Sequence, residues 1–244
     1  MPALRQRRMN HEIRPMQFGF ELGKHADGAC VARFGETVVL CTARIERRVP
    51  PHVRGTGAGW LSAEYAMLPN ATGNRIGRMK SLEGGRAKEI SRLIGRSLRA
   101  VCHLDNLGER QILIDCDVLH ADGGTRTTAI NGSFIALYRA LQTIDRAESV
   151  LHDSLAAISC VLIDGKLRVD PDYREDFAAD ADANFVFSGS GGLIEAQATA
   201  ESRPIAANHL SEMLQLAGAA CRKINQEQAR VLGLDEEGFL DRSR

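Results

Sequence analysis

Residues 111–144 read QILIDCDVLHADGGTRTTAINGSFIALYRALQTI, and the change of pattern within this stretch decides the fold class. In Gln111–Leu119, apolar and polar residues alternate, which predicts a strand with one buried face. From about Thr125 to Ile144, the apolar residues recur at helical spacing instead. The predicted buried face of this helix carries Ile130, Phe134, Leu137 and Leu141. A strand therefore leads through two glycines directly into an amphipathic helix.

Strands and helices are mixed in the rest of the chain as well. Further strands are predicted at residues 29–34, 37–45, 60–68, 155–163, 166–169, 184–187 and 193–199, the last four as a meander. Helices are predicted at residues 85–103 and from Asn208 onward, with Asn208 as a suitable N-cap. Residues 70–85 are expected to be a loop. Because regular βαβ alternation and linkers are absent from the sequence, we expect one α+β domain over residues 1–244, with an extended arm at about residues 1–14.

The composition excludes a membrane-spanning or secreted protein. Hydrophobic residues make up 44% of the chain and charged residues 25%, and no apolar run approaches the roughly 18 residues of a membrane span. The first residues lack the apolar core of a signal peptide. The six cysteines form no C-x-x-C pair and the seven histidines show no zinc-ligand spacing. We therefore expect a cytoplasmic protein with buried, reduced thiols.

The formal net charge of zero conceals a strong asymmetry along the chain. Residues 1–100 contain 18 Lys and Arg against 8 Asp and Glu, whereas residues 101–244 contain 13 against 23. A basic surface binds the phosphate backbone of nucleic acids, although a solvated face and tail would have the same composition. The candidate RNA-binding residues are Arg5, Arg7, Arg8, Arg14, Arg75, Arg78, Lys80, Arg92, Arg96 and Arg99.

Two predicted helices begin with the same combination of glycine and arginine. Gly84-Gly85-Arg86 precedes the first long helix, and Asp122-Gly123-Gly124-Thr125-Arg126-Thr127 precedes the second. The first N–H groups of a helix lack partners and attract anions, and glycine lets an anion approach the backbone closely. Either motif alone is also explained as a simple turn. Together they suggest a phosphate held from two sides, by Arg86, Gly124, Thr125 and Arg126.

A third glycine-rich segment has a different interpretation. Residues 188–192 read SGSGG, which is also typical of phosphate-binding loops. However, a predicted strand follows this segment where a phosphate loop would open a helix. A hairpin turn is therefore favoured.

Six carboxylates are concentrated in thirteen residues of the acidic half. They are Asp170, Asp172, Glu175, Asp176, Asp180 and Asp182. A solvated loop explains such a cluster, and so does a magnesium site, which needs only one or two carboxylates together with water and substrate phosphate. Asp115 and Asp117 share one face of their strand, where a structural role is favoured over a contribution to the same site.

The chain resembles the ribonuclease PH family of phosphate-dependent 3′-exoribonucleases over about residues 8–232. The most specific match is ADGGTRT at residues 121–127. Other matching segments are KHADG (24–28), VLCTA (39–43), GW (59–60) with AEY (63–65), MLP (67–69), RLIGR (92–96), DCDVL (115–119), and Glu175-Asp176 with Asp182 and Asn184.

The resemblance implies a fold, a reaction and an assembly. The implied fold is the two-layer α+β arrangement of ribosomal protein S5 domain 2, with mixed sheets packed on helices. Arg86 and Gly124-Thr125-Arg126 would bind inorganic phosphate, the co-substrate, and Asp176 and Asp182 would hold a divalent metal, Mg²⁺ or Mn²⁺, or act in proton transfer. The implied activity trims tRNA precursors and releases nucleoside 5′-diphosphates, in a hexameric ring built as a trimer of dimers.

Several positions depart from the family pattern, mostly where RNA would be held. Gln6-Arg7-Arg8 replaces Asp-Gly-Arg, and the loop after Pro69 is about two residues shorter and less basic. Phe177 replaces a usual serine and Ala183 a usual methionine. Ala198 and Ser202 replace glycines. The departures concern RNA binding and substrate choice more than the reaction.

Three functions are compatible with these observations. The main hypothesis is a phosphorolytic 3′-to-5′ exoribonuclease. A non-catalytic RNA-binding ring subunit of an exosome-like assembly is the alternative, although such a subunit would be expected to lack several of Arg86, Thr125, Arg126, Asp176 and Asp182. A phosphate-dependent enzyme acting on free nucleotides is disfavoured by the basic N-terminal arm.

Overall fold

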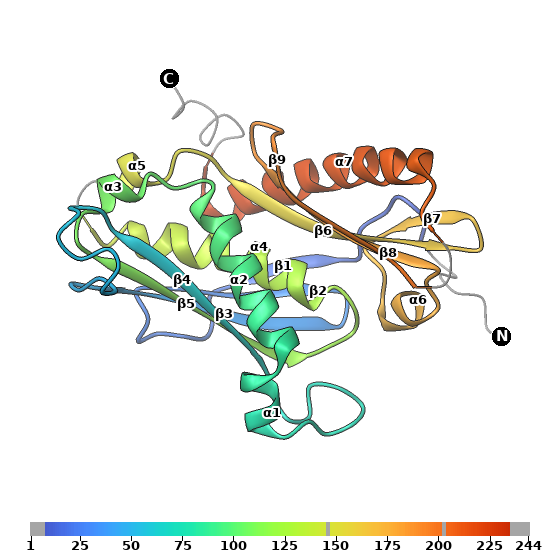
Figure 1. The fold of residues 1–244 in the computed structure, drawn as a ribbon, viewed down its shortest axis with the longest axis horizontal. Helices are drawn as coiled ribbons and strands as arrows, with labels where there is room; N and C mark the ends of the chain where they lie inside the picture. Colours follow the sequence, from blue (N-terminus) through green and yellow to red (C-terminus); the bar gives the residue numbers. More distant parts are fainter. Residues whose placement is uncertain (1–7, 145–146, 202–203, 235–244) are drawn as a thin grey trace.

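The computed structural model describes residues 8–144, 147–201 and 204–234. Two separate sheets, each packed against helices, make up this part of the chain (Figure 1). The arrangement confirms the α+β class predicted from the sequence. Within the described ranges, no helix is both long and apolar enough to cross a membrane.

The first sheet is built from the N-terminal half and has the order β1–β2–β3–β5–β4. Its strands are β1 (Met16–Gly19), β2 (Gly28–Phe34), β3 (Thr37–Glu46), β4 (Trp60–Met67) and β5 (Gln111–His120). β4 runs parallel to β5, and the other neighbours are antiparallel. The crossover from β4 to β5 contains α1 (Arg78–Glu83), α2 (Gly85–Arg99) and α3 (Leu104–Leu107). α2 packs on β4 through its apolar face, as its periodicity predicts.

The second sheet is antiparallel and has the order β7–β6–β8–β9. It comprises β6 (Leu155–Ile163), β7 (Lys166–Val169), β8 (Ala181–Ser188) and β9 (Leu193–Ala200). The last helix, α7 (Ala207–Leu232), packs against β6, β7 and β8 (Figure 1). The short helix α6 (Tyr173–Phe177) lies in the connection between β7 and β8. The acidic stretch of the sequence thus passes from the end of β7, through α6, into β8.

Helix α4 (Thr125–Leu141) lies between the two sheets. It packs against β2 and β3 of the first sheet and against β6 of the second. The predicted stripe of Ile130, Phe134, Leu137 and Leu141 is buried, but so are nearly all other residues of the helix. A helix buried all round is fixed from every side, so its first turn occupies a defined position between the two halves of the fold.

The structure corrects several details of the sequence prediction. The loop expected at residues 70–85 contains α1, and β1, α3, α5 (Ala147–Val150) and α6 were not predicted. The last four strands do not form a simple meander, because β8 pairs with β6 and leaves β7 at the edge. The N-cap of α7 is Ala206, and Asn208 lies inside the first turn. The hairpin turn predicted at residues 188–192 is confirmed, since β9 follows it directly.

All six cysteines are buried free thiols, as the sequence predicts. Burial raises the pKa of Cys30 and of Cys102 to about 12. Because the thiolate is the reactive form, these residues behave as small apolar core side chains at neutral pH.

Candidate active site

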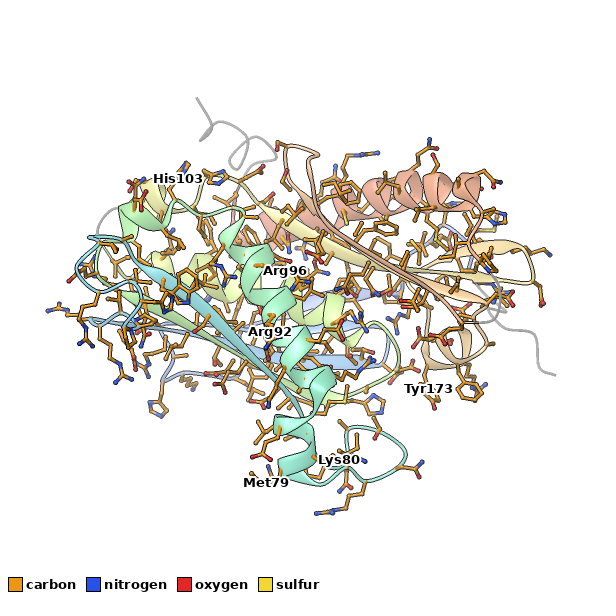
Figure 2. All side chains as sticks on the ribbon, in the orientation of Figure 1. Met79, Lys80, Arg92, Arg96, His103 and Tyr173 are labelled. Carbon is orange, nitrogen blue, oxygen red and sulfur yellow. The ribbon has the colours of Figure 1, made fainter. Side chains whose placement is uncertain are left out.

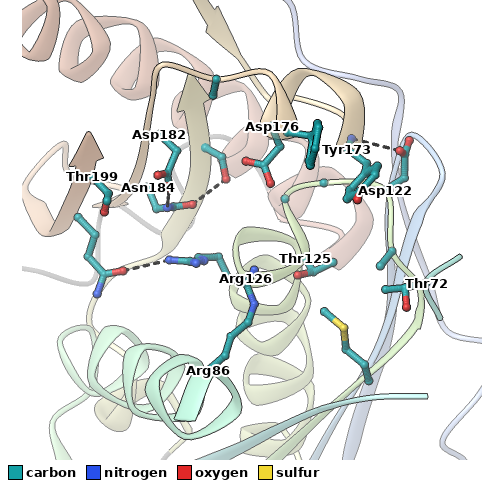
Figure 3. A pocket seen from close by; sticks show the side chains of 18 of the residues that line it. Thr72, Arg86, Asp122, Thr125, Arg126, Tyr173, Asp176, Asp182, Asn184 and Thr199 are labelled. Atoms are coloured by element: carbon teal, nitrogen blue, oxygen red, sulfur yellow. Dashed lines mark hydrogen bonds between the residues drawn. The ribbon is translucent and has the colours of Figure 1, made fainter. Parts of the chain in front are cut away.

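A cavity of about 1600 Å³ opens where the two sheets meet. Its walls come from the start of α2, the start of α4, the short helix α6 and the strands β8 and β9. The side chains converging there include Arg86, Thr125, Arg126, Asp176 and Asp182 (Figure 3). Residues from distant parts of the sequence therefore combine basic and acidic groups in one space.

The basic side of the cavity is formed by two helix starts. Gly124 is the N-cap of α4 in the left-handed conformation, with φ of 62°, and no side chain caps the helix. The first N–H groups of α4 are thus available to an anion. Arg126 from this helix and Arg86 from α2 extend toward the same region (Figure 3). The two Gly-Arg motifs, separate in the sequence, share one cavity.

Gly123 is required by a close contact between the loop that precedes α4 and the acidic segment. Its φ is +75°, and a Cβ atom there would lie 2.5 Å from the carbonyl oxygen of Pro171. Any other residue would push the two backbones apart. The glycine therefore keeps the start of α4 next to α6, which carries Asp176.

Thr125 is oriented by Tyr65, a residue that the sequence analysis did not place in the site. The Tyr65 hydroxyl donates a hydrogen bond of 2.8 Å to Oγ1 of Thr125. Burial raises the pKa of Tyr65 to about 12, so it remains a donor at neutral pH. Since Thr125 Oγ1 accepts from Tyr65, its own proton is free to point at a bound anion.

The acidic side of the cavity holds Asp176 on α6 and Asp182 on β8. Desolvation by the cavity walls raises the pKa of Asp176, and the charge of Asp182 raises it further. Arg86 and Arg126 oppose this shift by attracting the carboxylate. Two carboxylates that repel each other in one cavity form a donor set that suits Mg²⁺, whose other ligands are water and substrate oxygens.

The described part of the chain contains no larger cluster of protein ligands for a metal ion. Within those residues, no three or more His, Cys, Asp or Glu side chains are grouped to hold a metal ion. Asp115 and Asp117 lie on β5 and do not line the cavity. Asp115 faces Glu64 in the strand register, and desolvation is the main cause that raises its pKa. Glu89, Asp122 and Glu201 also line the cavity, but Asp182 is the carboxylate whose charge acts most strongly on Asp176, and these two are the candidate protein ligands.

A chain of polar contacts along the wall of the cavity links its two sides. Oγ1 of Thr127 lies 3.3 Å from Oγ of Ser159, which donates a 2.8 Å hydrogen bond to Oδ1 of Asn184. The amide nitrogen of Asn184 is 3.4 Å from Oδ2 of Asp182. This chain couples the first turn of α4 to the carboxylate on β8. Ser159 was not predicted, because nothing near it in the sequence marks it as part of a site.

Arg14 is buried where residues 8–14, the loop that precedes α4 and the acidic segment meet. Its guanidinium contacts both carboxylate oxygens of Asp170, at 3.0 Å from Nε and 2.7 Å from Nη2, and also donates to the carbonyl oxygen of Asp122. Arg8 donates to the carbonyl oxygen of Asp170 at 2.9 Å and to Glu175 at 3.3 Å. Arg8 and Arg14 therefore hold the acidic segment and the loop before α4 together.

Two of the candidate RNA-binding arginines have internal partners. The side chains of Arg8 and Arg14 are only 16% and 7% exposed, and both are committed to internal ion pairs. These contacts give both arginines a supporting role in the cavity, and their contact with RNA stays a prediction. The sequence did not indicate the supporting role, because Asp170, the partner of Arg14, lies 156 residues away.

Replacing Arg14 with methionine is expected to lower the free energy of unfolding by about 3 kcal/mol, since the buried Asp170 carboxylate would lose its two closest guanidinium contacts and keep the longer, 3.4 Å ion pair with Arg8. The matched control is Arg33→Ala, which breaks an ion pair with Glu21 between side chains that are 35% and 49% exposed. That loss should be about 1 kcal/mol or less. Urea denaturation of both variants measures the free energy of unfolding. Similar losses in the two variants would contradict the supporting role assigned to Arg14.

The other candidate RNA-binding residues lie outside the cavity or outside the described ranges. Arg75, Arg78, Lys80 and Arg92 are exposed. Arg96 forms two 2.7 Å hydrogen bonds with Glu195, and Arg99 lies over the Trp60 ring at 4.8 Å. Figure 2 shows Arg92 and Arg96 along α2 and Lys80 on the projecting α1. Arg5 and Arg7 belong to residues 1–7, which the structure does not describe.

Comparison with known proteins agrees with this geometry. Residues 12–141 match the 3′ exoribonuclease family, domain 1, and residues 153–220 match domain 2 of that family. The chain is 48% identical over 225 residues to ribonuclease PH of Mesorhizobium japonicum (strain LMG 29417 / CECT 9101 / MAFF 303099), covering 89% of this chain and 94% of the relative.

Two solved structures have the same fold at low sequence identity. Rice (Oryza sativa) Rrp46 is 19% identical with a TM-score of 0.76, covering 92% of this chain and 98% of its own. A chain of the Archaeoglobus fulgidus exosome with RNA bound to the active site is 17% identical with a TM-score of 0.77, covering 90% of each. These similarities support the S5 domain 2-like architecture expected from the sequence. The family matches and the curated relative together establish that the chain belongs to the 3′ exoribonuclease family, in its ribonuclease PH branch.

Proposed function

We propose that Arg86 and the start of α4, Gly124-Thr125-Arg126, bind the inorganic phosphate that attacks the 3′ end of RNA. The chain itself is a phosphorolytic 3′-exoribonuclease, as its family and its curated relative indicate. The assignment of residues rests on a single observation. Both Gly-Arg helix starts and both carboxylates line the same cavity.

The reaction exchanges one phosphorus–oxygen bond for another. An oxygen of the bound phosphate attacks the phosphorus of the terminal diester, and the bond from that phosphorus to the 3′-oxygen of the preceding nucleotide breaks. The 3′-oxygen keeps the electron pair and takes up a proton. The products are a nucleoside 5′-diphosphate and an RNA one nucleotide shorter, and the reverse reaction is nucleotidyl transfer.

The side chains of the cavity provide positioning and charge for this exchange. Arg86, Arg126 and the first N–H groups of α4 would orient the nucleophile and stabilise the negative charge of the transition state. Asp182 is the first candidate for a metal ligand or a general acid, and Asp176 the second. A Mg²⁺ held by these carboxylates, with Mn²⁺ as a substitute, would offset charge on the transferring phosphoryl group.

The physiological substrate and assembly are also proposals. We infer that the chain trims tRNA precursors, as the resemblance to ribonuclease PH suggests, and that it assembles into a hexameric ring of dimers in the cytoplasm. The match to an archaeal exosome core, at 16% identity and a TM-score of 0.73, supports a fold that is compatible with a ring. The buried, reduced cysteines are consistent with a cytoplasmic location. Light scattering of the purified chain tests the ring.

Incubation with a 3′-extended tRNA, with and without inorganic phosphate, tests the function. Nucleoside 5′-diphosphates are expected in the presence of phosphate and no release in its absence. Release of nucleoside monophosphates would indicate hydrolysis and contradict the proposal. RNA binding without any release would favour the alternative of a non-catalytic ring subunit. That alternative is less supported, because the five residues of which such a subunit would lack several are all present and line the cavity.

A further inference from the structure

Two exposed aromatic rings lie at the cavity, on the helix that carries Asp176. Tyr173 and Phe177 both line the cavity, and their side chains are 60% and 81% exposed. Phe177 is the most exposed large apolar side chain in the described residues. The two ring centroids are 6.2 Å apart, and the ring planes are inclined by 33°. Solvent-exposed aromatic rings at the rim of a binding cavity indicate a contact with a ligand.

The helix that presents these rings is firmly anchored. Asp172 caps α6 by accepting a 2.9 Å hydrogen bond from the backbone N–H of Glu175, and the Glu175 carboxylate contacts the Asp172 N–H in return. Glu175 is fully buried and pairs with Arg8 and Arg168. The inner face of α6 thus fixes the helix, and neither exposed ring is needed for that purpose.

The rings are also tied to the phosphate side of the cavity. The backbone N–H of Tyr173 donates to the Asp122 carboxylate at 3.2 Å. Asp122 directly precedes Gly123 and Gly124, which lead into α4. Figure 3 shows Tyr173 beside Asp122 at the edge of the cavity, with Asp176 close to it. An RNA whose terminal diester lies between the arginines and the carboxylates would bring its bases next to α6.

From this arrangement, we propose that Phe177, backed by Tyr173, is a stacking platform for a nucleobase near the 3′ end of the RNA. The proposal deepens the proposed function and rests on it. Aromatic rings bind bases of any sequence, because every base has a π face. The platform would supplement the cationic contacts with an interaction that is insensitive to salt, since only phosphate contacts release counterions.

The first test measures the affinity of single-stranded RNA in the absence of phosphate and metal, so that turnover does not interfere. Phe177→Ser is expected to weaken binding by about tenfold or more, a typical loss for one stacked base. The slope of log affinity against log salt should remain unchanged. Leu210→Ser, at a residue on α7 that is 40% exposed and outside the cavity, is the matched control and should bind normally.

The second test identifies the base that stacks. RNAs with single abasic positions are bound to the wild type and to Phe177→Ser. If the platform exists, one abasic position near the 3′ end weakens wild-type binding as much as the substitution does, and the two losses are not additive. Phe177→Trp should retain affinity, and its added fluorescence should respond to intact RNA but not to that abasic RNA. Additive losses at every position would overturn the platform.

Measurements of activity and of oligomeric state distinguish this proposal from a failure of the proposed function and from a contact between two copies of the chain. With the wild type, release of nucleoside diphosphates tests the proposed function independently of the binding experiments. In Phe177→Ser, the KM for RNA should rise while the KM for phosphate stays the same, because the phosphate site is untouched. A changed oligomeric state in this variant would assign the rings to a contact with a second copy of the chain, and would overturn the proposal.

Discussion

Alanine in place of Arg126 or Arg86 is expected to abolish phosphate-dependent RNA degradation, with a loss in rate of about 100-fold or more. The guanidinium group donates two parallel hydrogen bonds to phosphate oxygens, a geometry that no other side chain reproduces. Both arginines line the cavity next to the uncapped start of α4. The loss should be greatest at low phosphate concentration, where capture of the nucleophile limits the rate.

RNA affinity should change much less than activity in these two variants. The proposed RNA contacts use other groups, namely the exposed cations on α1 and α2 for the phosphate backbone and the platform on α6 for a base. The control is Arg230→Ala, at an arginine on α7 that is 71% exposed and pairs only locally with Glu227 in the structure described. Rates measured across a phosphate titration, with RNA binding measured in parallel, test the assignment. Normal activity of either pocket variant at low phosphate would remove that arginine from the site.

The sequence predicted those parts of the site that depend on local pattern. The strand–glycine–helix pattern of residues 111–144 located the start of α4, and periodicity located α2, because both helices are long enough to show it. The resemblance added Asp176 and Asp182. The sequence suggested that the two helix starts hold one anion, and α2 and α4 do pack on the same sheet and against each other. What the sequence alone could not reveal is that the second sheet brings Asp176 and Asp182 into the same cavity.

Short elements and long-range contacts were missed for physical reasons. α6 has five residues, too few for a periodic pattern, although Asp172 and Glu175 at capping-box spacing were a usable signal. β1 has four residues and takes its place only through pairing with β2. Arg14 was a candidate RNA-binding residue in a basic segment, and only the folded chain places it against Asp170.

Asparagine in place of Asp182 is expected to cost far more activity than asparagine in place of Asp180. Asp182 lines the cavity next to Asn184, whereas Asp180 is not among the lining residues and accepts a 3.0 Å hydrogen bond from the backbone N–H of Asp164. The substitution keeps the shape of the side chain but removes its charge and its titratable proton. Two positions separated by one residue therefore provide a matched pair.

A metal titration distinguishes the two roles left to Asp182. If the carboxylate holds Mg²⁺, excess Mg²⁺ or Mn²⁺ should partly restore activity in Asp182→Asn, because Asp176 and the substrate phosphate still offer oxygen ligands. If Asp182 donates the proton to the leaving 3′-oxygen, added metal should restore no activity, since the amide of asparagine has no acidic proton to give at neutral pH. Nucleoside diphosphate release is measured for both variants over the same metal range. Equal losses in Asp182→Asn and Asp180→Asn would mean that the acidic segment acts only through its overall charge, and neither role could then be assigned to Asp182.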